Sequence, residues 1–357
     1  MRIVHVVNSL EPGGMENGVC NIVNGLASRK FDTHVACLER RGSFAERLSG
    51  SVHVLGKSRG FSPRAVFNLA RLLFRLRPAV LHTHNLGPLI YANLATLGGR
   101  TCRIIHGEHA QLAPWEIEPR RIRQRHRLYR GCCAIHTVSR GQVDDLVRHG
   151  FAHEKIRSIP NGVDTVRFTP GDRSEAKREL GLPENEPVVG LVARFGPYKR
   201  HDALIAARPD AQLLFVGSGG SEEARIRQLA EGNARVHFTG FRRDPETCYR
   251  AMDLLAIPSS NEGMSNAALE AMSCGVAALG NLGCGLEEII TSGKNGVIAD
   301  LTQPAELARE ISALLAKPSE LVDIGRRART TVETRFSITA MLDAYEQLYR
   351  PARDGNS

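Results

Sequence analysis

Short apolar runs alternate along the chain with longer segments in which apolar residues recur every three or four positions. The first apolar run is Ile3–Val7, and a second of the same kind is Val188–Ala193. Runs that are apolar throughout are typical of parallel strands buried on both faces, and the segments between them predict helices. We therefore expect two α/β units, each opening on one of these strands.

Further runs of strand length follow each opening strand. They are 33–38, 52–55, 80–84, 103–107 and 134–138 after the first, and 212–216, 236–239, 254–258, 276–279 and 296–298 after the second. Because these runs are separated by segments long enough for helices, they indicate βαβ units and therefore two parallel sheets.

The boundary between the two units is expected where Pro and Gly flank a short helical segment, at 169–187. This divides the 357 residues into a first domain at 1–168 and a second at 169–337. The final segment, 338–357, opens with an amphipathic helical pattern, and we expect it to pack back onto the first domain.

Composition excludes a disordered chain and a membrane-spanning one. Hydrophobic residues make up 42% of the sequence, the mean hydropathy is −0.22, and no window approaches 18 consecutive apolar residues. The N-terminus runs directly into an apolar strand rather than a signal cleavage site. The eight cysteines form no C-x-x-C pair, so we expect reduced thiols in a cytoplasmic protein.

The net charge of +9 is concentrated in the first half of the chain. Residues 1–170 carry 25 Lys and Arg against 12 Asp and Glu, whereas residues 171–357 carry 22 against 26. A basic half either faces an anionic surface or serves as a solubilising surface. The segment 120–130 carries six arginines, which indicates either a solvated helix or attraction to an anionic lipid or a lipid diphosphate. Nucleic acid is disfavoured because only Trp115 and Tyr129 are aromatic nearby.

A glycine-rich turn follows the first strand and contains Gly13 and Gly14. It matches neither G-x-G-x-x-G nor a P-loop, so two interpretations stay open. Either a ligand approaches the backbone closely at a helix N-terminus, or the turn only connects a strand to a helix.

Charged residues follow two strands of the second unit. Arg194 and Lys199 lie in the loop after Val188–Ala193, where a guanidinium fork and an ammonium suit a diphosphate. After the strand at 254–258, Glu262 lies in a loop and Glu270 about one turn into a short helix. Carboxylates accept hydrogen bonds from vicinal hydroxyls, and the N–H groups at the start of that helix suit a phosphate or sugar oxygen.

Histidines are frequent on the strands of the first unit. His82 and His84 alternate along one strand and so share a face, while His106 and His109 flank a Gly-Glu turn. No H-E-x-x-H motif or cysteine pair accompanies them, and we predict no metal site. We take His109 as the functional candidate and expect the others to pack or form hydrogen bonds.

Several motifs together resemble the family 4 retaining glycosyltransferases. The matching segments are GGMENGV at 13–19, HGEH at 106–109, IPNGVDTVRF at 159–168, ARFGPYKRHD at 193–202, LLFVGSGG at 213–220, VHFTGF at 236–241 and the E-x7-E segment at 262–270. The resemblance covers nearly the whole chain and implies the GT-B architecture, in which two Rossmann-like domains with parallel sheets face each other across a cleft. More narrowly, the chain resembles sugar transferases of bacterial exopolysaccharide gene clusters.

By position, the resemblance implies a role for each candidate residue. Arg194 and Lys199 would hold the donor diphosphate, Glu262 the sugar hydroxyls and Glu270 the ribose hydroxyls, while His109 would lie near the donor sugar and the reacting centre. The remaining contacts to the donor or acceptor would come from Gly13, Gly14, Gly217, Gly219, Phe241, Gly263, Met264, Ser265 and Asn266.

Two positions depart from the family pattern. Arg200 stands where a glycine usually follows the lysine, so it either strengthens diphosphate binding or faces solvent. Met264 lies in a loop position where Phe or a second Gly is commoner, which leaves the preferred donor sugar open.

The sequence thus predicts a metal-independent, retaining hexosyltransferase that needs no cofactor. Its donor would be a UDP- or GDP-linked sugar, and its acceptor a glycan or a polyprenyl-diphosphate-linked glycan. There is no D-x-D to hold a metal, so fixed cations and a helix N-terminus would stabilise the departing diphosphate. Two alternatives are a GT-B nucleotide-sugar epimerase and a nucleotide-sugar-binding protein without turnover. A peripheral contact with the inner face of the cell membrane is a further expectation.

Overall fold

The computed structural model describes residues 1–113 and 115–350 and divides the chain into two compact units. Unit 1 is formed by Met1–Asn161 together with the last helix, α13 (Ile338–Tyr349), and unit 2 by Gly162–Ser337. The expected boundary at 168/169 lies too late. Val163 N donates to Phe336 O at 2.9 Å, and Ser273 Oγ donates to Phe168 O at 2.6 Å, so 162–168 is bound into unit 2. The part of 338–357 beyond residue 350 lies outside the described residues.

Unit 1 contains a parallel sheet of seven strands in the order β3-β2-β1-β4-β5-β6-β7. The strands are β1 (Arg2–Ser9), β2 (Asp32–Arg40), β3 (Ser51–Val54), β4 (Val80–His84), β5 (Arg103–Glu108), β6 (Cys132–Thr137) and β7 (Ile156–Ser158). All the runs predicted in this half are strands. The edge strand β7 was not predicted because it has only three residues and one of them is arginine.

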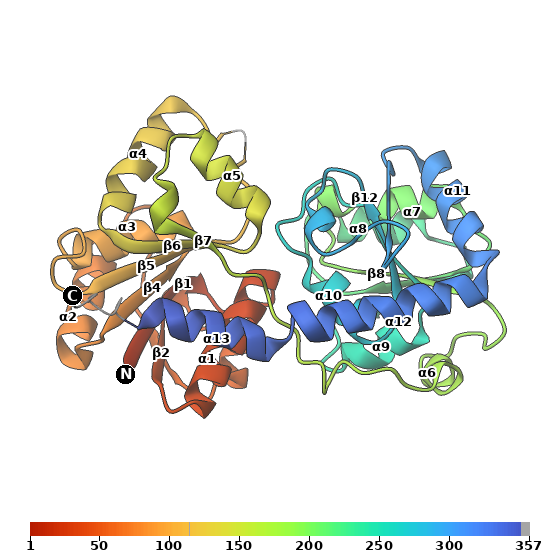
Figure 1. Ribbon diagram of the computed structural model, residues 1–357, viewed down its shortest axis with the longest axis horizontal. Coiled ribbons are helices and arrows are strands. Elements are labelled where there is room, and N and C mark those ends of the chain that lie inside the picture. The colour runs from red at the N-terminus through yellow and green to blue at the C-terminus, as the bar shows by residue number, and fades with distance from the viewer. Residues whose placement is uncertain (114, 351–357) are drawn as a thin grey trace, which may run out of the picture. The chain divides into compact units, whose positions relative to one another are not determined.

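Helices cover both faces of this sheet (Figure 1). They are α1 (Gly14–Ser28), α2 (Pro63–Leu76), α3 (Leu86–Ala95), α4 (Pro119–Arg130) and α5 (Arg140–Arg148), with 3-10 turns at Ser43–Arg47 and His153–Lys155. One buried cluster contains Leu26 of α1 and Leu342 of α13. Another contains Leu69 of α2, Leu89 of α3 and Leu146 of α5. The strand order reverses at β1, so right-handed crossovers place α1 on one face and α2–α5 on the other.

Unit 2 repeats this plan with six parallel strands in the order β10-β9-β8-β11-β12-β13. The strands are β8 (Val188–Val192), β9 (Gln212–Val216), β10 (Val236–Gly240), β11 (Leu254–Ile257), β12 (Ala277–Asn281) and β13 (Val297–Ala299). Every one matches a predicted run within two residues. The α/β expectation is therefore confirmed for both units.

The helices of unit 2 are shorter than those of unit 1, apart from the last two. They are α6 (Arg173–Glu179), α7 (His201–Ala207), α8 (Glu223–Leu229), α9 (Pro245–Ala251), α10 (Asn266–Ser273), α11 (Pro304–Leu315) and α12 (Pro318–Arg335), with 3-10 turns at Pro197–Lys199 and Leu286–Glu288. None of the helices in the described ranges of the chain is both long and apolar enough to cross a lipid bilayer.

Each sheet has a point at which the chain changes direction. In unit 1 the chain runs outward from β1 to β3 and returns to β4 beside β1, and in unit 2 it returns to β11 beside β8. Ligands of open α/β sheets bind beyond the carboxyl ends of the strands at such a switch point. The residues that follow β1, β4, β8 and β11 are therefore the first to inspect for a site.

Candidate functional site

Beyond the switch point of unit 2, Lys199 and Glu262 form an ion pair. Lys199 Nζ lies 2.6 Å from Glu262 Oε1, and both side chains are mostly shielded from solvent. Lys199 comes from the 3-10 turn after β8, and Glu262 from the loop after β11. With Ser259, Ser265 and Ala267, the pair lines a small hollow at the ends of the two strands. Both residues were predicted at one site, but the ion pair between them was not predicted.

Backbone contacts fix the loop that carries Glu262. Glu262 N donates to Cys284 O at 2.8 Å, and Ser260 N donates to Tyr198 O at 3.0 Å, which joins this loop to the turn of Lys199. Gly285 has φ +101°, and a Cβ there would lie 2.5 Å from Glu262 O. Glycine is therefore required at 285 for the loop to approach this closely.

Helix α10 begins at this same edge of the sheet. Ser265 is its N-cap, and its Oγ accepts from Ala268 N at 3.3 Å. Ser265 and Met264 are buried, whereas Gly263 and Asn266 are partly exposed. The positive end of the helix dipole therefore lies beside the Lys199–Glu262 pair, in a position that favours anions.

Glu270 lies one turn into α10, as the sequence predicted. Its Oε2 accepts a hydrogen bond from the buried Tyr249 hydroxyl at 2.7 Å. Burial, together with the negative charge of Glu270, raises the pKa of Tyr249 well above its usual value, so the tyrosine remains a donor. Tyr249 thus orients the Glu270 carboxylate, a role that was not predicted from the sequence.

The two arginines near Lys199 differ in environment. Arg194 is exposed, and in the part of the chain that the structure describes its side chain has no hydrogen bond or ion pair. Arg200 instead donates to the carbonyls of Leu301 and Thr302 at 2.7 and 2.6 Å. Arg200 therefore binds backbone of its own unit, a role that neither interpretation of this residue had included.

The candidate residues after β9 and β10 lie along the same edge of the sheet. Gly217 has φ +136°, and its N–H donates to Gly240 O at 2.9 Å. The carbonyl of Gly219 accepts from Phe195 N at 2.8 Å, while Phe241, which follows β10, is half exposed. Because β10, β9, β8 and β11 are neighbours, these residues and the Lys199–Glu262 pair form one continuous edge.

In unit 1 the glycine-rich turn lies at the N-terminus of α1. Gly13 is the N-cap of the helix, with extended backbone, and the Glu16 carboxylate occupies the space that a Cβ at Gly13 would fill. A carboxylate at this end is favourable to the helix dipole but repels a phosphate. At Gly13 and Gly14 this arrangement favours an uncharged hydroxyl-bearing group over a phosphate.

Five histidines gather on one face of the unit 1 sheet and form what we call the histidine cluster: His5, His82, His84, His109 and His136. Strand register explains the gathering, since His5 pairs with His82, and Gly107 lies between His84 and His136 on adjacent strands. A Cβ at Gly107 would lie 2.5 Å from His136 Nε2 and 3.0 Å from His109 Nε2, so this glycine leaves the space that the rings fill.

Hydrogen bonds divide the histidine cluster into two sets. His84 bonds His5 at 3.1 Å and His109 at 2.8 Å, whereas His82 bonds His136 at 2.8 Å and the Tyr349 hydroxyl of α13 at 2.6 Å. Burial lowers the pKa of all five rings, to about 3 for His5 and about 4 for His109. The rings are therefore neutral at neutral pH.

The distance between the bonded nitrogens of His84 and His109 is that of a hydrogen bond rather than of two ligands on one metal. Two nitrogens that bind one tetrahedral metal at about 2.05 Å lie about 3.3 Å apart. His84 Nδ1 and His109 Nε2 are 2.8 Å apart, which suits an N–H···N bond better. The absence of a metal site stays a prediction, but the hydrogen-bonding role expected for the neighbours of His109 agrees with these contacts.

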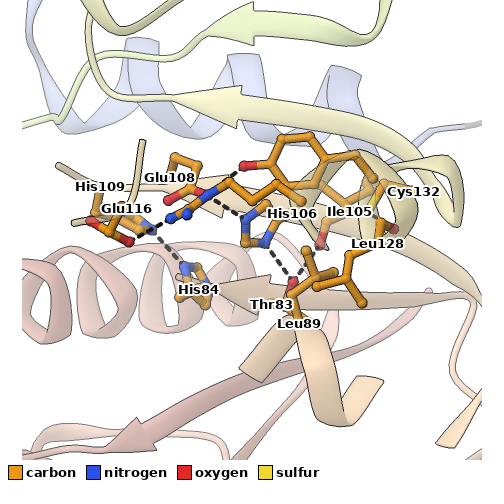
Figure 2. Close-up of polar contacts among 12 residues, drawn as sticks. Thr83, His84, Leu89, Ile105, His106, Glu108, His109, Glu116, Leu128 and Cys132 are labelled. Carbon is orange, nitrogen blue, oxygen red and sulfur yellow. Dashed lines mark hydrogen bonds and ion pairs between the residues drawn. The ribbon is translucent and has the colours of Figure 1, made fainter. Parts of the chain in front are cut away.

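On the opposite face of the sheet, an ionic group is buried under α4 (Figure 2). Glu108 accepts from Arg125 Nε at 3.2 Å and from the Tyr129 hydroxyl, and it lies 3.3 Å from His106 Nε2. Arg125 also donates to Glu116 at 2.6 Å. Although burial opposes ionisation, these contacts lower the pKa of Glu108 to about 2. One of the six arginines in 120–130 is thus a core residue, and the other five are exposed.

Comparisons with known proteins identify the family of the chain. The model of Glycosyltransferase Family 4 matches residues 12–167, and that of Glycosyl transferases group 1 matches residues 172–331, so together they span most of the chain. The chain belongs to glycosyltransferase family 4. As a family 4 protein it is 35% identical over 219 residues to a D-inositol 3-phosphate glycosyltransferase of Segniliparus rotundus, and 31% identical over 278 residues to the enzyme of that name from Xylanimonas cellulosilytica. These matches cover 57% and 69% of this chain but only 49% and 65% of the relatives.

Solved structures show that the family 4 chain has the GT-B fold. HepE of Anabaena, solved with UDP-glucose, aligns with a TM-score of 0.88 over 98% of this chain and 99% of its own, at 23% identity. TarM of S. aureus aligns with a TM-score of 0.80 over 98% of this chain and 100% of its own, at 12% identity. Identities this low support the fold alone. The predicted GT-B class is confirmed.

Proposed function

We propose that this chain transfers a sugar from a nucleoside-diphosphate-sugar donor to a glycan or lipid-linked acceptor. The observation that carries the proposal is the Lys199–Glu262 ion pair at the switch point of unit 2, beside the exposed Arg194 and the N-terminus of α10. This edge offers cations to a diphosphate and carboxylates to hydroxyls. A nucleotide sugar presents both kinds of group.

The ion pair supplies two ligand contacts when it opens. A diphosphate attracts Lys199 and Arg194, and as negative charge grows on the departing phosphate these cations and the α10 N-terminus stabilise it. Glu262 is then free to accept from sugar hydroxyls, while Glu270, held by Tyr249, accepts from the ribose. Because fixed cations meet the departing charge, we propose transfer that needs no metal and no other cofactor.

We further propose that the reaction retains the anomeric configuration, as the family resemblance implies. Among the described residues near the pair, no side chain is a strong candidate for a nucleophile, so we propose a same-face reaction in which the departing phosphate takes the acceptor proton. A UDP- or GDP-linked donor is supported by the names of similar proteins. HepE was solved with UDP-glucose, and a Corynebacterium glutamicum relative, 32% identical over 205 residues, is named as GDP-mannose-dependent.

For the acceptor, we propose that unit 1 binds a hydroxyl-bearing glycan, free or polyprenyl-diphosphate-linked, in surface or exopolysaccharide assembly. Glu16 beside Gly13 favours hydroxyls over phosphate at the start of α1. The relatives from Segniliparus rotundus and Xylanimonas cellulosilytica are named as D-inositol 3-phosphate glycosyltransferases, so the exopolysaccharide role rests on the subgroup resemblance of GGMENGV and HGEHA.

Nucleotide binding tests the proposal directly. UDP or GDP, added in EDTA at a hundredfold excess over Kd, is expected to stabilise unit 2 by about 2.7 kcal/mol, which raises the Tm by roughly 5–10 °C for a domain of this size. Differential scanning fluorimetry measures the shift. Glu270→Gln should reduce it, whereas Arg309→Ala, at an exposed position of α11, should not. No shift with any nucleotide, or a shift only with added Mg²⁺ or Mn²⁺, would contradict the proposal.

The outer face of unit 1 supports a peripheral membrane contact. Helix α2 exposes Phe67 and Phe74, which are 68% and 77% exposed, and Arg64 and Arg71 alternate with them at helical spacing. Helix α4, in the same layer, adds its five exposed arginines. Apolar area together with basic residues is the combination that binds an anionic lipid surface. We propose that this layer docks on such a surface at the inner face of the cell membrane.

Vesicle sedimentation tests this contact. The protein is expected to pellet with vesicles that contain phosphatidylglycerol and to stay in the supernatant with pure phosphatidylcholine. Each basic residue near the surface contributes about 1 kcal/mol, so Arg64→Ala with Arg71→Ala should weaken binding roughly thirtyfold, and Phe67→Ser with Phe74→Ser should also release the protein. The matched pair Arg326→Ala and Arg309→Ala, on unit 2, serves as the control. Equal binding by the control and the α2 variants would refute the assignment.

A further inference from the structure

The most unusual polar feature of unit 1 is a chain of three histidine rings, His5, His84 and His109, which we call the histidine chain. His5 Nδ1 lies 3.1 Å from His84 Nε2, and His84 Nδ1 lies 2.8 Å from His109 Nε2. The inner two rings are fully buried, whereas His109 is partly exposed (Figure 2 shows the His84–His109 bond). The chain therefore leads from the core of the unit to a ring that a ligand can reach.

Only two proton arrangements satisfy both bonds of the histidine chain while each ring is neutral. In the first, protons sit on Nδ1 of every ring, so that each ring donates toward His109, and His109 presents Nδ1–H outward. In the second, protons sit on every Nε2, each ring donates toward His5, and His109 presents a bare Nδ1 lone pair. Because one ring's tautomer dictates the next, the outer ring is either a donor or a base.

The inner end of the histidine chain decides between the two. His5 Nε2 is buried and has no hydrogen-bond partner among the described residues. The second arrangement places a proton on this atom and so buries an unpaired N–H. The first leaves only an unpaired lone pair there, and buried donors without a partner are rarer in proteins than acceptors without one. The structure thus favours Nδ1–H on all three rings.

We propose that His84 and His5 are positioning residues that hold His109 in its Nδ1–H tautomer, so that His109 donates a hydrogen bond to a substrate oxygen rather than acting as a base. The role of His109 at the substrate rests on the proposed function. Its tautomer does not, because it follows from contacts within unit 1. Gly107 is part of the same device, since any larger residue would displace His136 and His109.

Side-chain NMR tests the tautomer without any substrate. With ¹⁵N-histidine labelling, long-range ¹H–¹⁵N correlations show which ring nitrogen carries the proton, and His109→Asn assigns the signal. We expect wild-type His109 to be protonated at Nδ1, and His84→Phe, which keeps a ring but removes both nitrogens, to shift that signal toward the Nε2–H form. An Nε2–H form in the wild type, or a His109 signal unchanged in His84→Phe, would overturn the proposal.

Kinetics tests the consequence for transfer. The amide nitrogen of asparagine takes the place of Nδ1 in histidine, so His84→Asn retains the donor to His109, and His109→Asn retains the donor to substrate. We expect His84→Asn to stay within about threefold of wild-type kcat and His84→Phe to lose about 10–100-fold, as for other groups that orient a functional histidine. The kcat of His109→Asn should likewise be higher than that of His109→Gln, because the amide nitrogen of glutamine takes the place of Nε2 rather than Nδ1.

Two controls separate the possible failures. His153→Asn, at an exposed position, should leave kcat unchanged, and the Tm of each variant shows whether it folds. Equal losses in His84→Asn and His84→Phe at equal Tm would mean that His84 only packs, which overturns the proposal. If the wild type transfers no sugar at all, the proposed function fails, while the NMR result still decides the tautomer. If His84→Phe does not fold, two measurements still test the proposal. The wild-type spectrum must show Nδ1–H on His109, and His84→Asn must keep kcat within about threefold of the wild type.

Discussion

Lys199→Ala is expected to lower the rate of sugar transfer about 10²–10³-fold while the fold stays intact. Removing one fixed group that meets developing negative charge typically costs this much. Lys199 is less exposed than Arg194, the other cation proposed for the diphosphate, and its ammonium lies beside the hollow at the ends of β8 and β11. Its loss leaves the departing diphosphate with Arg194 and the helix N-terminus alone.

Release of nucleoside diphosphate, with a cell-envelope extract as the source of acceptor, measures the loss. Lys199→Arg, which keeps the charge but not the compact ammonium, should lie between the wild type and Lys199→Ala. Lys317→Ala removes an exposed cation from the same unit and should change nothing. Full activity in Lys199→Ala would remove the ion pair from the proposed site.

Acidification below pH 6.5 is expected to unfold unit 1 before unit 2. The five rings of the histidine cluster have a lowered pKa when folded, so below pH 6.5 the unfolded chain binds protons that the folded unit cannot bind. Above pH 6.5 the rings do not lower the free energy of unfolding of unit 1. Below pH 6.5 each ring lowers that free energy by about 1.4 kcal/mol per pH unit, until the pH reaches the pKa of the ring in the folded unit. A loss on the order of 10 kcal/mol, as five such rings would give over about two pH units, is comparable with the usual stability of a domain.

Hydrogen exchange followed by mass spectrometry resolves the two units. Peptides from β4 and β5 should lose protection between pH 6.5 and 5, while those from β9 and β11 keep it, since the lowered histidines among the described residues of unit 2 are His201 and His237. The Glu108 carboxylate acts in a lower window, because its stabilisation is lost only between pH 4.5 and about 2. Simultaneous unfolding of both units near pH 4 would contradict the prediction. His82→Phe should flatten the pH dependence, and His153→Asn should not.

The sequence predicted nearly all strands because buried parallel strands leave a local signal. Val80–His84 and Gln212–Val216 were predicted to the residue, whereas β7 has three residues and too little apolar length to stand out. Helix α13 was likewise visible, because its apolar residues recur at helical spacing over its whole length.

The candidate site was predicted less completely, since contacts between distant segments leave no local signal. The sequence placed Lys199 and Glu262 together but not in an ion pair, and it gave no indication that Tyr249 would bind Glu270. It could have found the histidine cluster only from register: the pairing of His5 with His82 requires knowing that β1 and β4 are neighbours. The arginine-rich segment misled in part, because a count of charges cannot show that Arg125 is buried.

Because α13 belongs to unit 1, that unit is discontinuous along the chain, and unit 2 is an insertion between its two parts. The apolar residues of α1 that pack on α13, such as Leu26, therefore cannot make this contact until the ribosome has synthesised all of unit 2. The same helix supplies the Tyr349 hydroxyl that binds His82. During synthesis unit 2 can fold as a finished body first, and the histidine-bearing unit, though it begins at the N-terminus, is completed last.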